Sequence, residues 1–331
     1  MSERDQKSWT VAEAQAGQTV AAVVRELVPS LSWSKARDLV RSGQVRVDGR
    51  SVTDSTQRLR EGQRIEVGAG GPHSRGEPRR EPELLVHLDA DVTVVRKPAG
   101  LMTVPFERTD RDTLLSRARV AIRRLETRRG APHNPSLRAV QRLDKDTSGL
   151  VVFARTISAQ RDLQQQFTEH TALRRYLAVV HGLARDAVYD SILVPDRGDG
   201  LRGSVSPSPG GWGGDGRGGQ GVRSRQAITH VAVQERLRGA TLVACRLETG
   251  RTHQIRIHMA EAGHPLLGET VYVRDFAGPW LPAPRLMLHA TELGFVHPRS
   301  GKEIRFTEPP PEDFAEAVER LKLSTTSVVE R

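Results

Sequence analysis

The sequence predicts an α+β protein in which a large domain, built on a mixed but mostly antiparallel sheet, follows a small α/β domain. Three observations support this fold class. The chain has 331 residues, a length that suggests two domains. Residues 71–82 are rich in glycine, proline, arginine and glutamate, as linkers are. After them, many short apolar runs of strand length and a few helical patterns indicate residues 83–323 as the large domain.

The composition favours a polyanionic partner. The chain carries 50 Lys plus Arg against 40 Asp plus Glu, a net charge of +10, which suits a nucleic acid or an anionic membrane surface. The alternative is a chain that is merely rich in arginine. No apolar run reaches the length of a membrane span, and the N-terminus lacks the apolar region of a secretory signal. Cys245 is the only cysteine, which excludes an internal disulfide. We expect a cytoplasmic monomer that does not bind membranes.

The first domain is predicted to contain two helices followed by short strands. Apolar residues at helical spacing begin after Thr19, and a second helix is expected after Ser32 or Ser34, either of which can cap it. Asp48-Gly49 is a strong hairpin signal, and strand patterns lie on either side of it, at 45–47 and 64–67.

This arrangement, over residues 17–70, resembles the alpha-L RNA-binding motif. The motif implies contacts between phosphates and a basic helix face, which position a protein on RNA without reading its sequence. The basic residues of the second helix are Lys35, Arg37 and Arg41. A solvated charged face is the alternative.

The large domain is predicted from its apolar runs and helical periods. Strands are expected at 84–88, 92–96, 150–154, 176–180, 227–233, 241–247, 286–290 and 303–306, and helices at 114–125, 158–170, 252–262 and 312–323. Residues 196–226 are dense in glycine and cannot build a core. They are predicted to be a flexible insertion between two strands, whose arginines could also contact RNA.

The stretch Arg142-Leu143-Asp144-Lys145-Asp146-Thr147-Ser148-Gly149 is the centre of the sequence. Turn-forming residues stand between an extended segment and the apolar run 150–154. A loop of this kind would fix Asp144 at the end of a buried strand. On local spacing alone, an ordinary polar hairpin turn is the better explanation, since positioned carboxylates are common at turns.

Four motifs in order resemble those of the RluA-type pseudouridine synthases. The central one is Arg142 to Leu150, and the others are Arg96-Lys97-Pro98-Ala99-Gly100-Leu101, Arg174-Arg175-Tyr176-Leu177-Ala178 and Thr249-Gly250-Arg251-Thr252-His253-Gln254-Ile255-Arg256-Ile257-His258. The resemblance implies the family's α+β fold and isomerisation of uridine in RNA, without a cofactor. By analogy the accessory domain favours large-subunit ribosomal RNA over transfer RNA. One departure is Gln141, where the family usually has histidine.

The resemblance also implies roles for individual residues. Asp144 is expected to be the nucleophile, attacking C1′ of the sugar or C6 of the base, and Arg256 to pair with it and keep it ionised. Tyr176 is expected to lie against the uracil, and its hydroxyl to assist removal of the C5 proton. Arg142 is expected to fill the space left by the flipped nucleotide. The other residues expected to contact RNA or support the site are Gln141, Lys97, Thr147, Arg251 and His253.

Three other functions find some support in the sequence. A metal site could be built from His253, His258, His264 and Cys245, but no paired-cysteine motif supports it, and we expect no metal. A carboxylate-nucleophile hydrolase would need a second acid that no motif supplies. The main alternative is a non-enzymatic RNA-binding or ribosome-assembly protein that keeps the fold. The presence of Asp144, Tyr176 and Arg256 together argues against this alternative.

Overall fold

The chain forms two compact units, Met1–Glu81 and Pro82–Arg331. The computed structural model describes residues 7–29, 31–41, 44–52, 54–67, 84–107, 109–128, 136–197, 200–205 and 224–322. The expected linker, 71–82, lies outside these ranges. Within the described ranges, no helix is both long enough and apolar enough to cross a bilayer.

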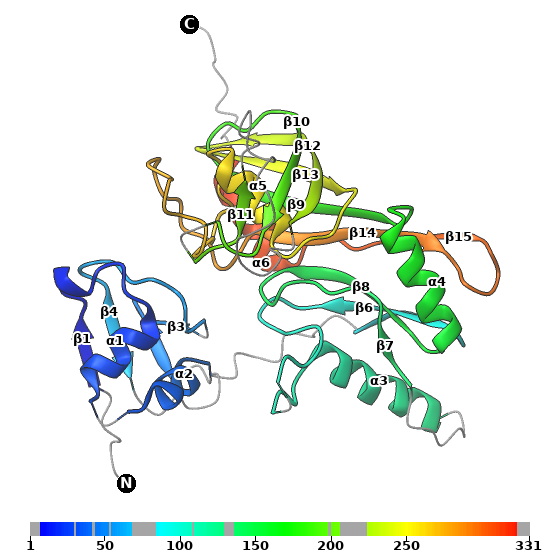
Figure 1. Ribbon diagram of the computed structural model, residues 1–331, viewed down its shortest axis with the longest axis horizontal. Coiled ribbons are helices and arrows are strands. Elements are labelled where there is room, and N and C mark those ends of the chain that lie inside the picture. Colours follow the sequence, from blue (N-terminus) through cyan, green and yellow to red (C-terminus); the bar gives the residue numbers. More distant parts are fainter. Residues whose placement is uncertain are drawn as a thin grey trace, which may run out of the picture. The chain divides into compact units, whose positions relative to one another are not determined.

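The first unit is a four-stranded sheet with two helices (Figure 1). Its elements are β1 (Lys7–Thr10), a 3₁₀ turn η1 (Glu13–Gln15), α1 (Val20–Leu27), α2 (Trp33–Arg41), β2 (Val45–Val47), β3 (Arg50–Val52) and β4 (Arg64–Val67), with strand order β1-β4-β2-β3. The Thr19 side chain caps α1 and that of Ser32 caps α2. Asp48 and Gly49 both have positive φ, 51° and 75°, as a tight hairpin turn requires. The unit begins earlier than residue 17, because β1 completes its sheet.

The second unit is built on an eleven-stranded sheet in the order β11-β10-β12-β13-β9-β14-β8-β6-β5, with β15 paired to β14 and β7 paired to β8 (Figure 1). The strands are β5 (Leu85–Leu88), β6 (Val92–Lys97), β7 (Arg138–Ala139), β8 (Ser148–Ala154), β9 (Leu173–His181), β10 (Ala187–Val194), β11 (Gly203–Val205), β12 (Arg225–Leu237), β13 (Ala240–Leu247), β14 (Leu288–Val296) and β15 (Glu303–Thr307). The helices are α3 (Leu114–Arg128), α4 (Ile157–Thr168), α5 (Gln254–Glu261) and α6 (Glu312–Leu321).

Strand β8 is buried along its whole length, which explains its continuous apolar run. Val151 and Phe153 belong to the buried cluster that includes residues of α3, whereas Leu150 and Val152 belong to the one that includes residues of α4. The two helices therefore cover opposite faces of the strand that follows the Asp144 loop.

The only parallel pairing among the described strands joins β8 to β14, through Ser148 with His289 and Gly149 with Ala290. Gly149 has φ 122°, and a Cβ on it would lie 2.2 Å from the Ala290 carbonyl oxygen. Glycine is required there by both the backbone conformation and the close approach of β14.

Two features of the second unit differ from the predictions. The insertion expected at 196–226 contains β11, which pairs with β10, so its first part extends the sheet; residues 206–223 lie outside the described ranges. Strand β10 was not predicted. Half of its positions are polar or exposed, because this strand lies near the edge of the sheet.

Candidate active site

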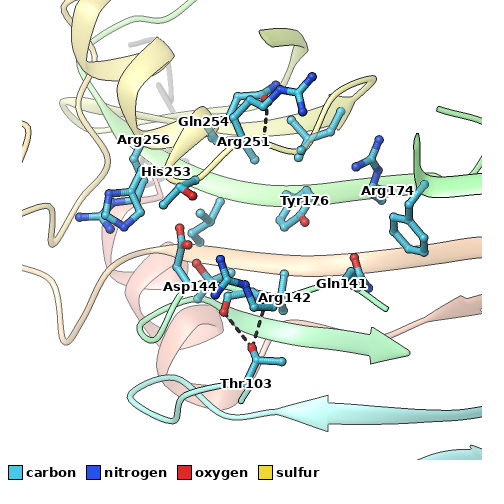
Figure 2. A pocket seen from close by; sticks show the side chains of 18 of the residues that line it. Thr103, Gln141, Arg142, Asp144, Arg174, Tyr176, Arg251, His253, Gln254 and Arg256 are labelled. Carbon is cyan, nitrogen blue, oxygen red and sulfur yellow. Dashed lines mark hydrogen bonds between the residues drawn. The ribbon is translucent and has the colours of Figure 1, made fainter. Parts of the chain in front are cut away.

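The loop that carries Asp144 is fastened to the segment that follows β6. The Thr103 hydroxyl accepts a hydrogen bond from the Leu143 backbone N–H at 3.1 Å and donates one to the Leu143 carbonyl at 2.8 Å (Figure 2). The Gly100 N–H donates to the carbonyl of Lys145 at 2.9 Å. Both neighbours of Asp144 are therefore held by backbone hydrogen bonds, which fixes the position of its Cα.

Lys97 is buried beneath the same loop. Its Nζ donates to the carbonyls of Lys145, Thr147 and Pro98 at 2.6, 2.8 and 3.1 Å, and the residue is 2% exposed. Burial lowers the pKa of Lys97 to about 7, and nearby carboxylates oppose this shift. Of the two roles expected for Lys97, the structural one matches this environment. The phosphate-facing role does not, because the amine is enclosed and bound to three carbonyls.

Asp144 lines a cavity of about 930 Å³, which is large enough for a nucleotide. It is the only carboxylate among the described residues that line the cavity. Its side chain is half-buried and makes no hydrogen bond or ion pair within the described parts of the chain. Figure 2 shows it pointing toward the side of the cavity where His253 and Arg256 lie. The carboxylate is thus left available to a ligand.

Arg256, on α5, is held by Glu269. Its Nε donates to Oε2 of Glu269 at 2.7 Å and its Nη2 donates to Oε1 at 2.6 Å, with both residues buried. Burial alone lowers the pKa of Arg256, but the hydrogen bond and charge of Glu269, and then the charge of Asp144, raise it above its ordinary value. The direct ion pair with Asp144 that the family resemblance implies is not present, because Glu269 binds the guanidinium. Asp144 acts on Arg256 only through its field.

Tyr176 lies in β9 at the cavity wall and is 8% exposed. Burial raises the pKa of the Tyr176 hydroxyl to about 12, and the charge of Asp144 contributes to the rise, whereas Arg174 opposes it. The side chain is therefore a neutral phenol over the whole physiological range. Leu143 and Ile255, which also line the cavity, belong to the same buried cluster as Tyr176, so its ring is rigidly packed.

His253 and Arg251 line the cavity just before α5. His253 occupies the position just before α5 in a left-handed conformation, with φ 60° and ψ 19°, and its Nδ1 lies 2.8 Å from the Tyr272 hydroxyl. Burial, followed by the charge of Arg256, lowers the pKa of His253. Arg251 donates from Nε to the carbonyl of Gln226 at 2.9 Å. A non-glycine residue with positive φ is uncommon, and such strain is found most often at functional sites.

The remaining predicted residues of the second unit also line the cavity. Arg142 is exposed, Gln141 is half-buried and Thr147 is buried. The Thr147 hydroxyl oxygen is enclosed and has no hydrogen-bond partner. The structure thus brings all of the predicted site residues of this unit together around one cavity, except for Lys97, which supports the loop from behind.

The predicted RNA contacts of the first unit lie on α2. Lys35 and Arg37 are exposed, and the side chain of Arg41 lies outside the described part of the chain. Trp33, at the start of the helix, is 44% exposed, and the guanidinium carbons of Arg25 and Arg37 lie 4.7 and 5.9 Å from the centre of its ring. This face of α2 offers cations and an aromatic ring to solvent.

Sequence reasoning missed three residues of the site. Glu269 holds Arg256, Thr103 holds Leu143, and Phe106, which lines the cavity, is 85% exposed. No local signal marks Glu269 or Thr103, since each acts through a partner distant in sequence. Phe106 stands in a segment without helical or strand periodicity, where an apolar residue already suggests a contact surface.

The side chains considered as a metal site are engaged elsewhere. His258 pairs with the hydroxyls of Thr229 and Ser191, at 2.8 and 2.9 Å, and His264 Nδ1 lies 2.9 Å from the His181 carbonyl. Cys245 is fully buried, and burial raises the pKa of its thiol to about 12.

Comparisons with known proteins agree with the fold. Residues 91–261 match the RNA pseudouridylate synthase family, and residues 20–65 match the S4 domain, the alpha-L motif expected for this region. The solved structure of human RNA pseudouridylate synthase domain containing 4 is similar in fold, with a TM-score of 0.55 and 21% identity; the match covers 72% of this chain and 92% of that one.

Two relatives match this chain over most of its length and of their own. The uncharacterized RNA pseudouridine synthase YlyB of Bacillus subtilis is 35% identical, over 88% of this chain and 90% of that protein. Ribosomal large subunit pseudouridine synthase D of Zymomonas mobilis is 33% identical, over 95% and 97%. The motifs, the fold and these matches lead to one conclusion: the chain belongs to the RluA-type RNA pseudouridine synthases and carries an N-terminal S4 domain.

Proposed function

We propose that this pseudouridine synthase modifies large-subunit ribosomal RNA and that Asp144 is its nucleophile. Several relatives that match over nearly their full length are named ribosomal large subunit pseudouridine synthase D, which supports the substrate. The observation that carries the role of Asp144 is its position as the one carboxylate around a nucleotide-sized cavity, with no hydrogen-bond or ion-pair partner for its side chain, both as judged among the described residues. A cytoplasmic location and a monomeric state belong to the same proposal.

The reaction needs few protein groups. The N1–C1′ glycosidic bond breaks, the uracil turns, and C5 forms a bond to C1′. The C5 proton is then lost to restore the ring, and N1 takes up a proton, so the product is an isomer of uridine. Unstacking the nucleotide costs a few kcal/mol. Phosphate contacts of the S4 domain and of the basic cavity rim offset that cost. Asp144 then attacks C1′ or C6, with the Arg256 guanidinium lining the same cavity.

Tyr176 serves this reaction through its ring. A neutral phenol packed in a strand supplies a flat face for the uracil at low entropic cost. Its raised pKa makes the phenolate too scarce to remove the C5 proton as a base, so the assistance expected from the hydroxyl is limited to hydrogen bonding. Arg142, exposed at the cavity rim, is suited to occupy the gap that the flipped nucleotide leaves in the RNA.

The proposal is tested with Asp144→Asn, which keeps the size and polarity of the side chain but removes the nucleophilic charge. On a large-subunit ribosomal RNA transcript, we expect conversion to be abolished while RNA affinity stays within about twofold, because most affinity comes from phosphate contacts. Asp146→Asn, two residues away and absent from the cavity lining, is the matched control. Pseudouridine formation by Asp144→Asn would remove the assignment.

The substrate is tested separately. Pseudouridines are mapped in RNA from cells with and without this protein. Loss of a large-subunit site supports the proposed substrate, whereas loss of a transfer RNA site alone contradicts it.

A further inference from the structure

Four arginines stand where the Asp144 cavity meets a second hollow of about 360 Å³. Both spaces are lined by Arg142, Arg202, Arg225 and Arg251. Arg202 directly precedes β11 and Arg225 begins β12, so these two come from the two sides of the glycine-rich insertion. The insertion thus contributes charged side chains to the edge of the active site.

Among the residues that the structure describes, these four arginines have no acidic partner. No described residue that lines the smaller hollow is acidic, and within the described parts of the chain none of the four forms an ion pair. Some other guanidinium groups of this unit do have acidic partners, as Arg256 has in Glu269 and Arg285 in Asp313. Burial, and then the charge of Arg225, lowers the pKa of Arg251. The charges of Arg225 and Arg251 therefore repel one another here, and a bound anion would offset that repulsion.

Arg174 supplies a second, independent observation. It is 6% exposed and lines the Asp144 cavity, yet its buried Nε has no hydrogen-bond partner. Its Nη2 donates to the Glu248 carbonyl. A Cβ on Gly250 would lie 2.7 Å from Nη1 of Arg174, so the absence of a side chain at Gly250 makes room for the guanidinium beside Arg251. A buried, unpaired N–H donor is costly unless a ligand accepts from it.

Unpaired guanidinium groups at the edge of a nucleotide-sized cavity suit phosphodiesters, whose oxygens match the planar fork of N–H donors. We propose that Arg202, Arg225 and Arg251, with Arg174 behind them, form a subsite for the backbone phosphates that flank the flipped nucleotide. The inference rests on the proposed function and extends it, because it names the part of the RNA that this wall of the cavity binds. These contacts hold the strand in place while Asp144 reacts.

The experiment compares the full chain with an Arg202→Gln/Arg225→Gln double variant. Both side chains are exposed, so the fold should be kept, which is checked by thermal unfolding. The matched control is Arg185→Gln/Arg320→Gln, which removes the same charge. Arg185 precedes β10, whose opposite end, at Val194, lines the smaller hollow; at about 3.3 Å per residue the length of β10 alone separates them by roughly 23 Å. Arg320 lies on α6, away from both spaces.

The probes are a five-nucleotide oligouridylate and its methylphosphonate analogue, in which the linkages are uncharged. For Arg202→Gln/Arg225→Gln we expect affinity for the phosphodiester probe to fall at least tenfold and affinity for the neutral analogue to stay unchanged. The slope of log Kobs against log salt should become shallower by about 1.4, since each phosphate contact on a single strand contributes about 0.7. The control variant should match the wild type in all three measurements. Arg202→Lys/Arg225→Lys should recover part of the affinity.

Three results would overturn the subsite: a wild-type protein that binds both probes equally, a double variant with wild-type affinity and slope, or an equal loss for both probes. A failure of the proposed function can be distinguished from a failure of the phosphate subsite. Asp144→Asn should keep the preference for the charged probe whether or not large-subunit RNA is the substrate, so lack of conversion on that RNA leaves the phosphate measurements valid.

Discussion

The Arg256 guanidinium and the Glu269 carboxylate form a bidentate ion pair, with N–O distances of 2.7 and 2.6 Å. Glu269 also accepts hydrogen bonds from the backbone N–H groups of Thr270 and Val271, at 3.0 and 2.9 Å. The orientation of Arg256 is therefore set by a residue outside the four family motifs. The pair uses the Nε and Nη2 donors of Arg256, and the guanidinium still lines the cavity that holds Asp144.

Replacing Glu269 with Gln should strongly destabilise the protein. The substitution leaves the buried Arg256 charge without a counter-charge, which typically costs about 3–5 kcal/mol in free energy of unfolding. Urea denaturation measures the loss. Glu316→Gln, an exposed position on α6, should change the value by less than about 0.5 kcal/mol. A variant as stable as the wild type would show that the pair contributes little.

The same pair predicts an acid limit to stability. Burial alone would raise the pKa of Glu269, but the hydrogen bond and charge of Arg256, with the backbone N–H groups, lower it below its ordinary value. A carboxyl with a depressed pKa in the folded state stabilises fully above its unfolded value of about 4.3, and this contribution is lost as the pH falls through the folded pKa. Between pH 5 and pH 3 the wild type should lose more unfolding free energy than Glu269→Gln. Equal losses of unfolding free energy in the wild type and in Glu269→Gln over this pH range would contradict the prediction.

Thr103→Val should loosen the Asp144 loop while filling nearly the same volume. The Leu143 backbone N–H and carbonyl lose their partner, which costs about 2–4 kcal/mol in unfolding free energy. Because the nucleophile is then less well positioned, we expect kcat to fall about tenfold or more with RNA affinity retained. Thr103→Ser keeps the hydroxyl and should stay near wild type. Equal kcat values for Thr103→Val and Thr103→Ser would show that the Thr103 hydroxyl does not position Asp144.

Tyr176 substitutions separate its ring from its hydroxyl. Tyr176→Phe keeps the stacking face and should retain RNA affinity, whereas Tyr176→Leu should weaken binding by about 1–3 kcal/mol, the contribution of one base–aromatic stack. Because the pKa of Tyr176 is raised to about 12, the wild-type rate should show no ionisation of this group below pH 11. A rate step near pH 10 that disappears in Tyr176→Phe would contradict the neutral phenol.

Removing residues 1–70 should weaken RNA binding without dismantling the catalytic site, because the cavity lies wholly within the second unit. The slope of log Kobs against log salt should become shallower by about 0.7–0.9 for each phosphate that the shortened chain no longer binds, and kcat at saturating RNA should be retained. Unchanged affinity and site choice in the shortened chain would deny the S4 domain a role in substrate binding.

Local patterns predicted most of the fold. The hairpin at Asp48-Gly49 and the buried strand after Asp144 were readable because turn residues and apolar runs act within a few positions. The partners of the site could not be read in this way. Glu269 meets Arg256 across thirteen residues, and Thr103 meets Leu143 across forty, through loops whose paths depend on the assembled sheet. Strand β1 was missed because its partner β4 is still more distant in sequence, with Lys7 opposite Val67.

The close approach of Gly149 to Ala290 has a consequence for a chain still being synthesised. Domains made first generally fold first, so the S4 domain is complete while most of the second unit is still untranslated. The wall of the cavity around Arg256, and the strand that seals Gly149 in place, are translated only in the last third of the protein. A nascent chain therefore acquires a means of holding RNA well before it acquires a means of altering it.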